Sequence, residues 1–384
     1  MHSSRSTLVL ACLLLAGLLA AAAPRAATGQ APAEAAHLVY VPLAARPIEP
    51  LGIVAGPAEL VAAKTLADQG VDPSRRAVKS LLSNAEEALQ APPCASAVYT
   101  NAAFDCLNRS AEGSYVLALA YNVTGDRRYA DGAAAFIRVW SEQLVAIDPS
   151  DDQPQLDWSR MAPAMIWGAD LLVGAPSWSA ADQGRFRAML VTLVLPKGQQ
   201  AAQRWNNWAD AGNLLRLSVA VYANLPAERA AAIASWKQHM DGQRQPNGTW
   251  LYGMLPDGSL AEENRRGADG LSYNQGALSL KTVFAEIARR GGDASLYAYR
   301  TPRGVGLKNG WDFLSPQVVA AAAGQCGWPY TPNHCVSYSN RSGWEVAYAF
   351  WRDPAYLGPI LLHRPYQWSN WSDPGYSTLL FGRP

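Results

Sequence analysis

The sequence predicts an all-α fold built from antiparallel helix pairs. Apolar residues recur at steps of three and four, as in Leu280, Val283, Phe284 and Ile287, and this spacing places them on one face of a helix. Strand patterns are few, and the best one, residues 249–254, precedes a Pro-Asp-Gly turn. The 384 residues are 49% hydrophobic and 16% charged, which excludes a largely disordered chain. Both a closed α/α barrel and an open helical array fit such a series of pairs.

The first 27 residues have the pattern of a secretory signal peptide. Arg5 precedes an apolar run over residues 8–23, which is too short and too rich in Ala for a good membrane span. Cys12 lies inside this run rather than at its end, so it is not a lipoprotein cysteine. We therefore expect a secreted or periplasmic protein with no membrane partner. Residues 28–55, rich in Ala and Pro, are expected to form a leader ahead of one large domain, residues 56–384.

Capping residues and prolines place the helices in order. Pro57 opens the first helix and Pro73 the second, which runs to about residue 89. An apolar segment over 115–123 ends at Gly125, and the next helix begins near Asp126 with one buried face. The stretch after residue 352 is rich in Pro, Trp and Tyr and is expected to be irregular. Further helices are expected at about 159–173, 179–195, 208–223, 226–242, 270–290, 307–323 and 342–352.

Four cysteines follow the expected signal peptide, in two near pairs. Cys94 and Cys106 are 12 residues apart, and Cys326 and Cys335 are 9 apart. In a secreted protein this spacing favours two local disulfides. A zinc site that includes His334 is the alternative, but zinc ligands normally show tighter spacing. We expect no metal and no other cofactor.

The charge balance gives no global basic field of the kind that binds nucleic acid. The whole chain has a formal charge of +1, and without residues 1–27 it has 30 basic and 31 acidic residues. Any acidic ligand must therefore meet a local cluster of Arg. The 14 Trp and 16 Tyr suit stacking on sugar rings, although a hydrophobic core would use them equally well.

Three polar segments each come directly before an apolar helix. Residues 204–210 hold two adjacent Asn between two Trp, which is more than an N-cap needs. Residues 255–273 and 338–344 also bring Arg and aromatic residues to a helix start, although either segment also fits a solvated surface. The candidate residues of the three segments are Arg204, Trp205, Asn206, Asn207, Trp208, Arg265, Arg266, Tyr273 and Arg341.

These residue types suit β-elimination from a uronic acid. Arg pairs bidentately with a carboxylate, and an Asn amide can hydrogen-bond to the same group. The C5 proton of a uronate is acidified only by that carboxylate, so the developing enolate charge must be neutralised. A Tyr can accept or donate the proton. In mannuronate H5 and O4 lie on the same face of the ring, so one Tyr could serve both steps.

On these motifs the chain resembles the alginate lyase family over most of residues 56–352. Residues 113–129, which end in Thr-Gly-Asp-Arg-Arg-Tyr, and residues 167–182 resemble two of the family's helix pairs. Residues 256–262, Pro-Asp-Gly-Ser-Leu-Ala-Glu, followed by Arg266 and Tyr273, resemble its catalytic loop. The resemblance implies an incomplete α/α toroid and a lyase, of poly-mannuronate type, for an acidic polysaccharide. We expect it to act as a monomer.

In that family an Asn–His pair acts together with an Arg and a Tyr. The resemblance implies that Asn207 and Arg266 neutralise the carboxylate and that Tyr273 is acid and base. Trp208 holds the position of the family His, so Tyr273 works alone, the substrate is a different uronate, or the chain binds sugar without cleaving it. His334 is a candidate substitute. The expected substrate contacts are Trp205, Asn206, Trp208, Arg204, Arg265 and Arg341.

Two other functions stay open. A glycoside hydrolase on a similar toroid would use two carboxylates, from among Asp157, Glu262, Glu263 and Asp269. A non-catalytic protein would bind an acidic polysaccharide and cleave no bond.

Overall fold

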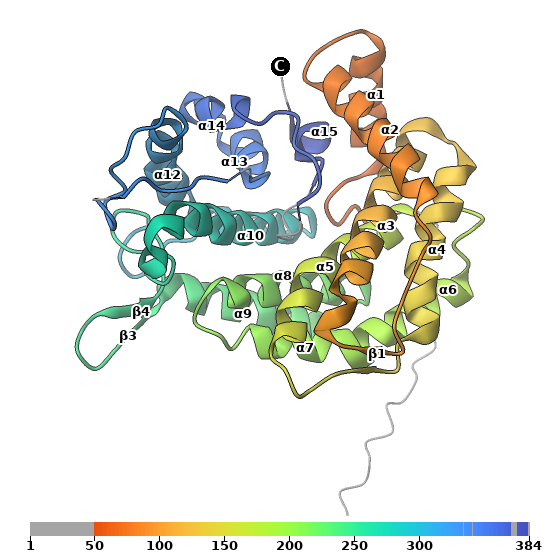
Figure 1. Cartoon of the computed structure of the whole chain (residues 1–384), viewed down its shortest axis with the longest axis horizontal. Coiled ribbons are helices and arrows are strands. Elements are labelled where there is room, and N and C mark those ends of the chain that lie inside the picture. The colour runs from red at the N-terminus through yellow and green to blue at the C-terminus, as the bar shows by residue number, and fades with distance from the viewer. Residues whose placement is uncertain (1–49, 333, 340, 370–374, 383–384) are drawn as a thin grey trace, which may run out of the picture. The chain divides into compact units, whose positions relative to one another are not determined.

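The computed structural model describes residues 50–332, 334–339, 341–369 and 375–382, all within one structural unit, Pro47–Pro384. The expected signal peptide and residues 28–49 of the expected leader lie outside the described residues. Helices make up most of this unit (Figure 1), as predicted. Their bounds are α1 (Pro57–Asp68), α2 (Ser74–Gln90), α3 (Phe104–Thr124), α4 (Arg127–Gln143), α5 (Gln153–Leu171), α6 (Ala180–Met189), α7 (Leu195–Ala201), α8 (Asn207–Tyr222), α9 (Pro226–Asp241), α10 (Gly270–Arg290), α11 (Ser295–Ala298), α12 (Leu307–Ala322), α13 (Gly343–Trp351), α14 (Leu357–Leu361) and α15 (Ser377–Phe381).

Strands in the described part of the chain are short and peripheral. β1 (Val98–Tyr99) pairs in parallel with β2 (Ala146–Ile147). β3 (Gln243–Arg244) pairs in antiparallel fashion with β4 (Trp250–Tyr252), which lies inside the strand predicted at 249–254. This hairpin leads directly into the polar loop before α10.

The helices form an inner and an outer layer. The inner helices α3, α5, α8, α10 and α13 contact one another in that order, and α4, α7, α9 and α12 pack against them. Seventeen of the 21 residues of α10 are buried, whereas α9 buries only four of 16, so α10 is an inner helix and α9 an outer one. In Figure 1, α10 lies between the α8–α9 pair and the C-terminal helices α12 to α14. The fold is an incomplete α/α toroid, as predicted.

The C-terminal stretch joins the last helices of the ring to the first. α15 contacts α13, α1 and α2. The Asn84 amide on α2 donates to the Tyr376 hydroxyl at 3.0 Å, and Arg290 on α10 pairs with Glu59 on α1 at 2.5 Å. The stretch expected to be irregular therefore includes short helices, whose buried residues include Tyr356, Ile360 and 379–381. Helices of five residues are too short to show a periodic pattern.

Residues 51–55, the end of the expected leader, pack on the toroid. The backbone N–H groups of Leu51 and Ile53 donate to the Asp170 carboxylate on α5, at 2.7 and 3.0 Å. Ile53 and Val54 are each only 2% exposed. Buried apolar contact and charge-assisted hydrogen bonds therefore hold this segment against an inner helix.

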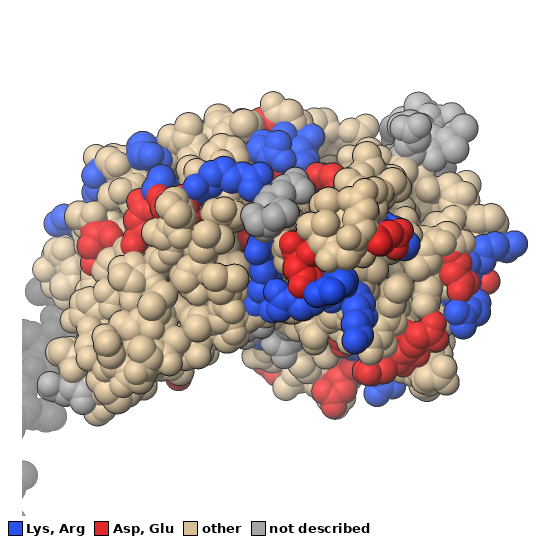
Figure 2. Space-filling view, turned by 90° about the horizontal axis from the view of Figure 1, so that it is seen from above, with Lys and Arg blue, Asp and Glu red and all other residues tan. Residues whose placement is uncertain are grey.

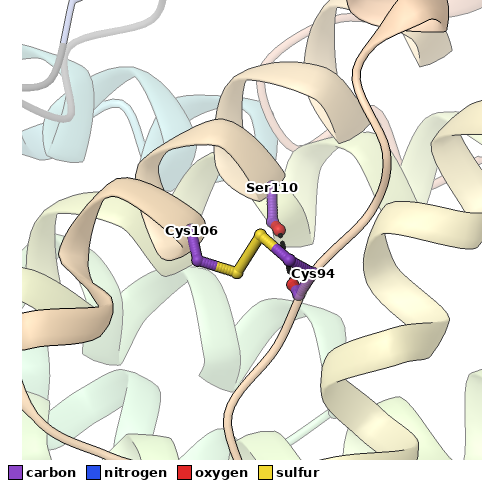
Figure 3. Close-up of a disulfide and its surroundings, with 3 residues drawn as sticks. All are labelled: Cys94, Cys106 and Ser110. Carbon is purple, nitrogen blue, oxygen red and sulfur yellow. Dashed lines mark hydrogen bonds between the residues drawn. A yellow bond between two sulfur atoms is a disulfide. The ribbon is translucent and has the colours of Figure 1, made fainter.

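Both predicted disulfides are present. Cys94 is bonded to Cys106 on α3, and Cys326 is bonded to Cys335 in the loop before α13. Figure 3 shows that Ser110, one turn after Cys106, donates to the Cys94 carbonyl oxygen, at 3.3 Å. The disulfide and this hydrogen bond together fasten the segment after α2 to the start of α3.

We expect loss of the Cys94–Cys106 disulfide to lower the free energy of unfolding by roughly 2 to 3 kcal/mol, because the reduced chain gains loop entropy when it unfolds. The test is chemical denaturation of the Cys94→Ala/Cys106→Ala double variant. Ser110→Ala, which removes only the hydrogen bond, is the control and should lose less than half as much. Equal unfolding midpoints for the double variant and the wild type would contradict the prediction.

Charge is mixed over the surface. On the face shown in Figure 2, Lys and Arg side chains lie beside Asp and Glu side chains. Among the helices described here, none is long and apolar enough to cross a bilayer.

Candidate active site

A loop held at both ends carries the predicted catalytic Arg. The Asp257 carboxylate accepts from the backbone N–H of Ser259 at 2.9 Å, and Gly258 in the same turn has φ +95°. A Cβ at Gly258 would lie 2.2 Å from the Asn309 carbonyl oxygen, so this close approach requires glycine. Asn274 on α10 accepts from the Leu260 N–H at 2.7 Å. The loop is thereby fixed both to α12 and to the helix that carries Tyr273.

The three predicted catalytic residues lie together. Asn207, Arg266 and Tyr273 line one cavity of about 380 Å³, here called the reaction cavity. They come from the first turn of α8, the loop before α10 and the first turn of α10. The rest of the lining consists of Leu156, Arg160, Arg204, Trp205, Asn206 and Trp208.

Glu263 holds Asn207 and Arg266, the two residues expected to bind a carboxylate. It is fully buried, and it accepts from the Asn207 backbone N–H at 2.8 Å and from Arg266 Nε at 3.1 Å. Burial, with the nearby Glu262 charge, raises the pKa of Glu263 to about 7, although the Arg266 guanidinium opposes the shift. The sequence offered Glu263 only as a loop acid or a hydrolase carboxylate, so this role was missed.

Arg266 is held against the predicted acid and base. Its guanidinium carbon lies 4.8 Å from the centre of the Tyr273 ring, a cation–π distance. Among the described residues, Glu263 is its hydrogen-bond acceptor, through Nε. The two Nη groups remain for a ligand, in the fork geometry that suits a carboxylate.

The two adjacent asparagines have different functions. Asn206 is the N-cap of α8, because its side chain accepts from the Trp208 N–H at 3.2 Å. Asn207 is 6% exposed, and its Oδ1 accepts no hydrogen bond from the described residues. A buried amide oxygen without a donor costs free energy, which a bound ligand would recover.

Of the three other arginines expected to contact substrate, Arg204 lines the reaction cavity, whereas Arg265 and Arg341 do not. Arg204 lies 5.2 Å from the Trp208 ring centre and pairs with Asp152. Arg265 does not line the reaction cavity; its guanidinium lies 5.5 Å from the Trp205 ring centre and donates to the carbonyls of β4. Arg341 does not line it either and is 4% exposed.

No described histidine takes the place of the family His in the reaction cavity. His334 is exposed and lies outside the lining, and His363 also lies outside it. His239 lines a neighbouring cavity instead. Trp208 therefore gives the lining an aromatic wall without a titratable group, and Tyr273 is the residue there whose hydroxyl can transfer a proton.

The lining also lacks the carboxylates of the hydrolase alternative. Glu263 is buried as described, and Glu262 accepts from the Gly253 N–H at 2.8 Å. Asp157 accepts from the Tyr99 hydroxyl at 2.9 Å, and Asp269 accepts from the Ser337 hydroxyl at 2.9 Å. Three guanidinium groups and no carboxylate line the described reaction cavity.

The family model described as "Alginate lyase" matches residues 90–323, which is more than half of the chain and includes every residue of the reaction cavity. The chain belongs to the alginate lyase family. This membership, first indicated by the resemblance of the motifs, makes it a polysaccharide lyase. No curated protein sequence matches the chain.

Solved alginate lyase structures share this fold. Alginate lyase A1-III from Sphingomonas species A1 is 17% identical, with a TM-score of 0.65 over 89% of this chain and 100% of that one. An alginate lyase from Bacteroides ovatus is 16% identical, with a TM-score of 0.63 over 84% of this chain and 97% of that one. An A1-III variant solved in complex with a tetrasaccharide is 17% identical, with a TM-score of 0.60 over 76% of this chain and 84% of that one.

One buried group, of which His239 lines the neighbouring cavity, has ligand atoms of the kind that hold metals. Atoms of Asp210, His239 and Glu262 lie within 4.8 Å of one another. The Lys281 ammonium contacts the Asp210 carboxylate and lies 2.8 Å from His239 Nδ1. Burial acts to raise the pKa of Asp210, but Lys281 and His239 lower it below its usual value. The lysine thus supplies a positive charge from within the protein, and we assign no metal to this group.

Proposed function

We propose that this family member cleaves a uronate polymer such as alginate by β-elimination. Asn207 and Arg266 neutralise the carboxylate at the sugar that loses its C5 proton. Tyr273 transfers the protons. Arg160 and Arg204 add positive charge near the carboxylates of the bound chain, Arg204 while it is paired with the exposed Asp152. Trp205 and Trp208 provide apolar walls for the sugar rings.

The elimination can be written with one proton-transferring residue. The Tyr273 oxygen, as phenolate, takes the proton from C5, and the electron pair is first held as an enolate on the carboxyl group. This pair then forms the C4–C5 double bond as the C4–O4 bond breaks. The resulting Tyr273 hydroxyl then gives its proton to the departing O4. Neutralisation by Arg266 and Asn207 stabilises the enolate that develops between these events.

The observation that carries the proposal is the composition of the reaction cavity. Three Arg, two Asn and one Tyr surround the space, whereas a glycosidase needs a pair of carboxyl groups flanking the bond. Such a lining attracts an anionic sugar and provides proton transfer through a hydroxyl. It therefore favours a lyase over a hydrolase.

A second candidate rests on Trp208. A Trp at the position of the family His removes one proton-transferring group, so a protein that binds acidic polysaccharide without cleaving it is the alternative. Incubation with a panel of acidic polysaccharides, followed by ultraviolet absorbance of unsaturated uronate, tests the proposal. An absorbance rise with a mannuronate-rich polymer is expected. Binding without any rise would favour the second candidate.

Glu263 should control the acid side of the pH profile. Its ionised form holds Arg266, so kcat/KM should rise as pH increases through about 7, the pKa of Glu263. We expect Glu263→Gln to abolish this rise and to lower kcat/KM at high pH at least about tenfold. Glutamine carries no charge and has one acceptor oxygen for two donors, so either Arg266 or the Asn207 N–H loses its partner.

Glu262→Gln is the matched control for that profile. It removes the neighbouring charge that raises the pKa of Glu263 but leaves the hydrogen bond to Arg266, so the rise should persist at lower pH. Initial rates across pH measure both effects. An unchanged rise in Glu263→Gln would show that another group controls it.

We expect acidic glycans to bind and neutral ones to be excluded, because the reaction cavity presents Arg160, Arg204 and Arg266. Affinity should fall as salt is added, since exposed charges are screened over about 8 to 10 Å at physiological ionic strength. Affinity electrophoresis in gels containing neutral or acidic glycans measures this directly. Equal retention by both kinds of gel would refute the expectation.

We also propose that the protein acts outside the cytoplasm, secreted or periplasmic, as a monomer. The signal-peptide pattern of residues 1–27 and the two disulfides support export. Mass measurement of the exported protein tests the cleavage of that segment, and sedimentation tests the oligomeric state.

A further inference from the structure

A second, larger cavity adjoins the reaction cavity. It has a volume of about 670 Å³, and we call it the outer cavity. Arg204 and Trp205 line both cavities, so these two side chains form the boundary that the cavities share. The rest of the outer cavity is built from α7, α8, α9 and the β3–β4 hairpin.

Trp205 is exposed at the boundary between the two cavities. Its side chain is 44% exposed, whereas eight other Trp side chains are almost completely buried. The Arg265 guanidinium, which is hydrogen-bonded to the carbonyls of β4, lies 5.5 Å from the ring centre and packs on one side of the indole. An exposed indole that is shared by two cavities suits the apolar face of a sugar ring.

The outer cavity offers unused neutral hydrogen-bonding groups. Gln203, Gln238 and Gln243 are exposed, and none of their side-chain amides has a hydrogen-bond partner among the described residues. The charged Arg216 is already paired with Glu228 at 2.6 Å. Amides that can both donate and accept suit sugar hydroxyl groups better than they suit a simple anion.

The floor of the outer cavity has a buried polar atom without a partner. His239 is 4% exposed, and its Nε2 makes no hydrogen bond with the described residues. Its ring stacks on Tyr252, with centres 4.9 Å apart and planes 13° apart, so the imidazole is fixed in position. An unsatisfied buried nitrogen in the lining costs free energy until a ligand hydroxyl reaches it.

We propose that the outer cavity binds further sugars of the same uronate polymer, which passes over Trp205 from the reaction cavity. This inference rests on the proposed function, because the reaction cavity is where the polymer is cleaved. It adds a second binding region with neutral recognition of hydroxyl groups. The enzyme then prefers chains long enough to occupy both cavities.

Equilibrium binding of size-defined mannuronate oligomers, from the dimer upward, tests this proposal. Calorimetry with the Tyr273→Phe protein avoids cleavage during the measurement. Affinity should increase with oligomer length. In the same background, Gln203→Ala/Gln238→Ala should weaken binding of the longest oligomers by about 5- to 100-fold, because two hydrogen bonds are lost. The ratio of the double variant's Kd to the parent's Kd should grow with oligomer length.

Gln90→Ala is the control, since Gln90 is exposed at the end of α2 and lines neither cavity. It should bind every oligomer as the parent protein does. The proposal would be overturned if the ratio of the two Kd values, double variant to parent, were the same at every oligomer length. It would also be overturned if the parent's affinity did not depend on oligomer length. Length-dependent binding without unsaturated product from the wild type would overturn the proposed lyase chemistry but support the outer cavity. No binding of any oligomer would overturn both.

Discussion

Tyr273→Phe should lower kcat by about 10²- to 10⁴-fold, the usual contribution of a general acid–base group. The change removes only the phenolic oxygen. The ring remains in the first turn of α10, in contact with the Arg266 guanidinium. Substrate affinity should change little, because Arg266 and Asn207 still meet the carboxylate. Initial rates and calorimetric binding on a mannuronate polymer measure the two effects separately.

The control for that variant is Tyr121→Phe. Tyr121 is on α3 and lines neither the reaction cavity nor the outer cavity. The change removes the same atom from a different tyrosine, so kcat should stay within a few-fold of the wild type. A near-normal rate in Tyr273→Phe would refute the proposed mechanism and assign the proton transfer to another group.

Arg266→Ala should lower kcat/KM by about 10²- to 10³-fold, the effect of removing one group that stabilises a developing anion. Binding should weaken as well, since the guanidinium meets the carboxylate before and during the reaction. Arg266→Lys keeps the positive charge but not the fork of donors, so it should recover only part of the loss.

Arg265→Ala is the matched control for Arg266→Ala, because it removes the same charge one residue earlier. Arg265 hydrogen-bonds to β4 and does not line the reaction cavity. Thermal unfolding of both variants is needed beside the kinetics, since Arg266→Ala leaves the buried Glu263 without its cationic partner. Equal kinetic losses in the two variants would contradict the role given to Arg266.

Most of the helical fold follows from periodicity and caps. Pro57, Pro73, Gly125 and Asp126 mark helix boundaries that the structure confirms to within about one residue. Other bounds differ: α3 already begins at Phe104, before the apolar segment at 115–123, and the helix expected at 179–195 continues through residues 190–194 into α7. α5 begins at Gln153 and not near residue 159. Pro154 in its first turn, after two acidic residues, was the available signal. Leu156, which lines the reaction cavity, lies in this missed part of the helix, whereas Arg160 lies inside the predicted helix and had no sequence signal of its own.

Site residues that belong to a sequence motif could be predicted. Site residues whose role depends only on tertiary packing could not. The loop motif and its spacing identified Arg266 and Tyr273, and both line the reaction cavity. Glu263 was ambiguous because a Glu beside another Glu reads equally well as a solvated loop, and only the folded loop buries it against Asn207. Trp205 was an expected substrate contact, but its exposure could not be predicted, because exposure depends on tertiary packing.

The contacts that complete the ring have a consequence for the order of folding. Asn84 meets Tyr376 across 292 residues, and Glu59 meets Arg290 across 231 residues. Closing loops of this length is entropically costly until many other contacts exist, so such pairings form late. The segment from Leu156 to Tyr273, which supplies the whole reaction cavity, is translated before either Arg290 or Tyr376. Assembly of the catalytic residues can therefore begin on a nascent chain, whereas ring closure waits until the last helix has been synthesised.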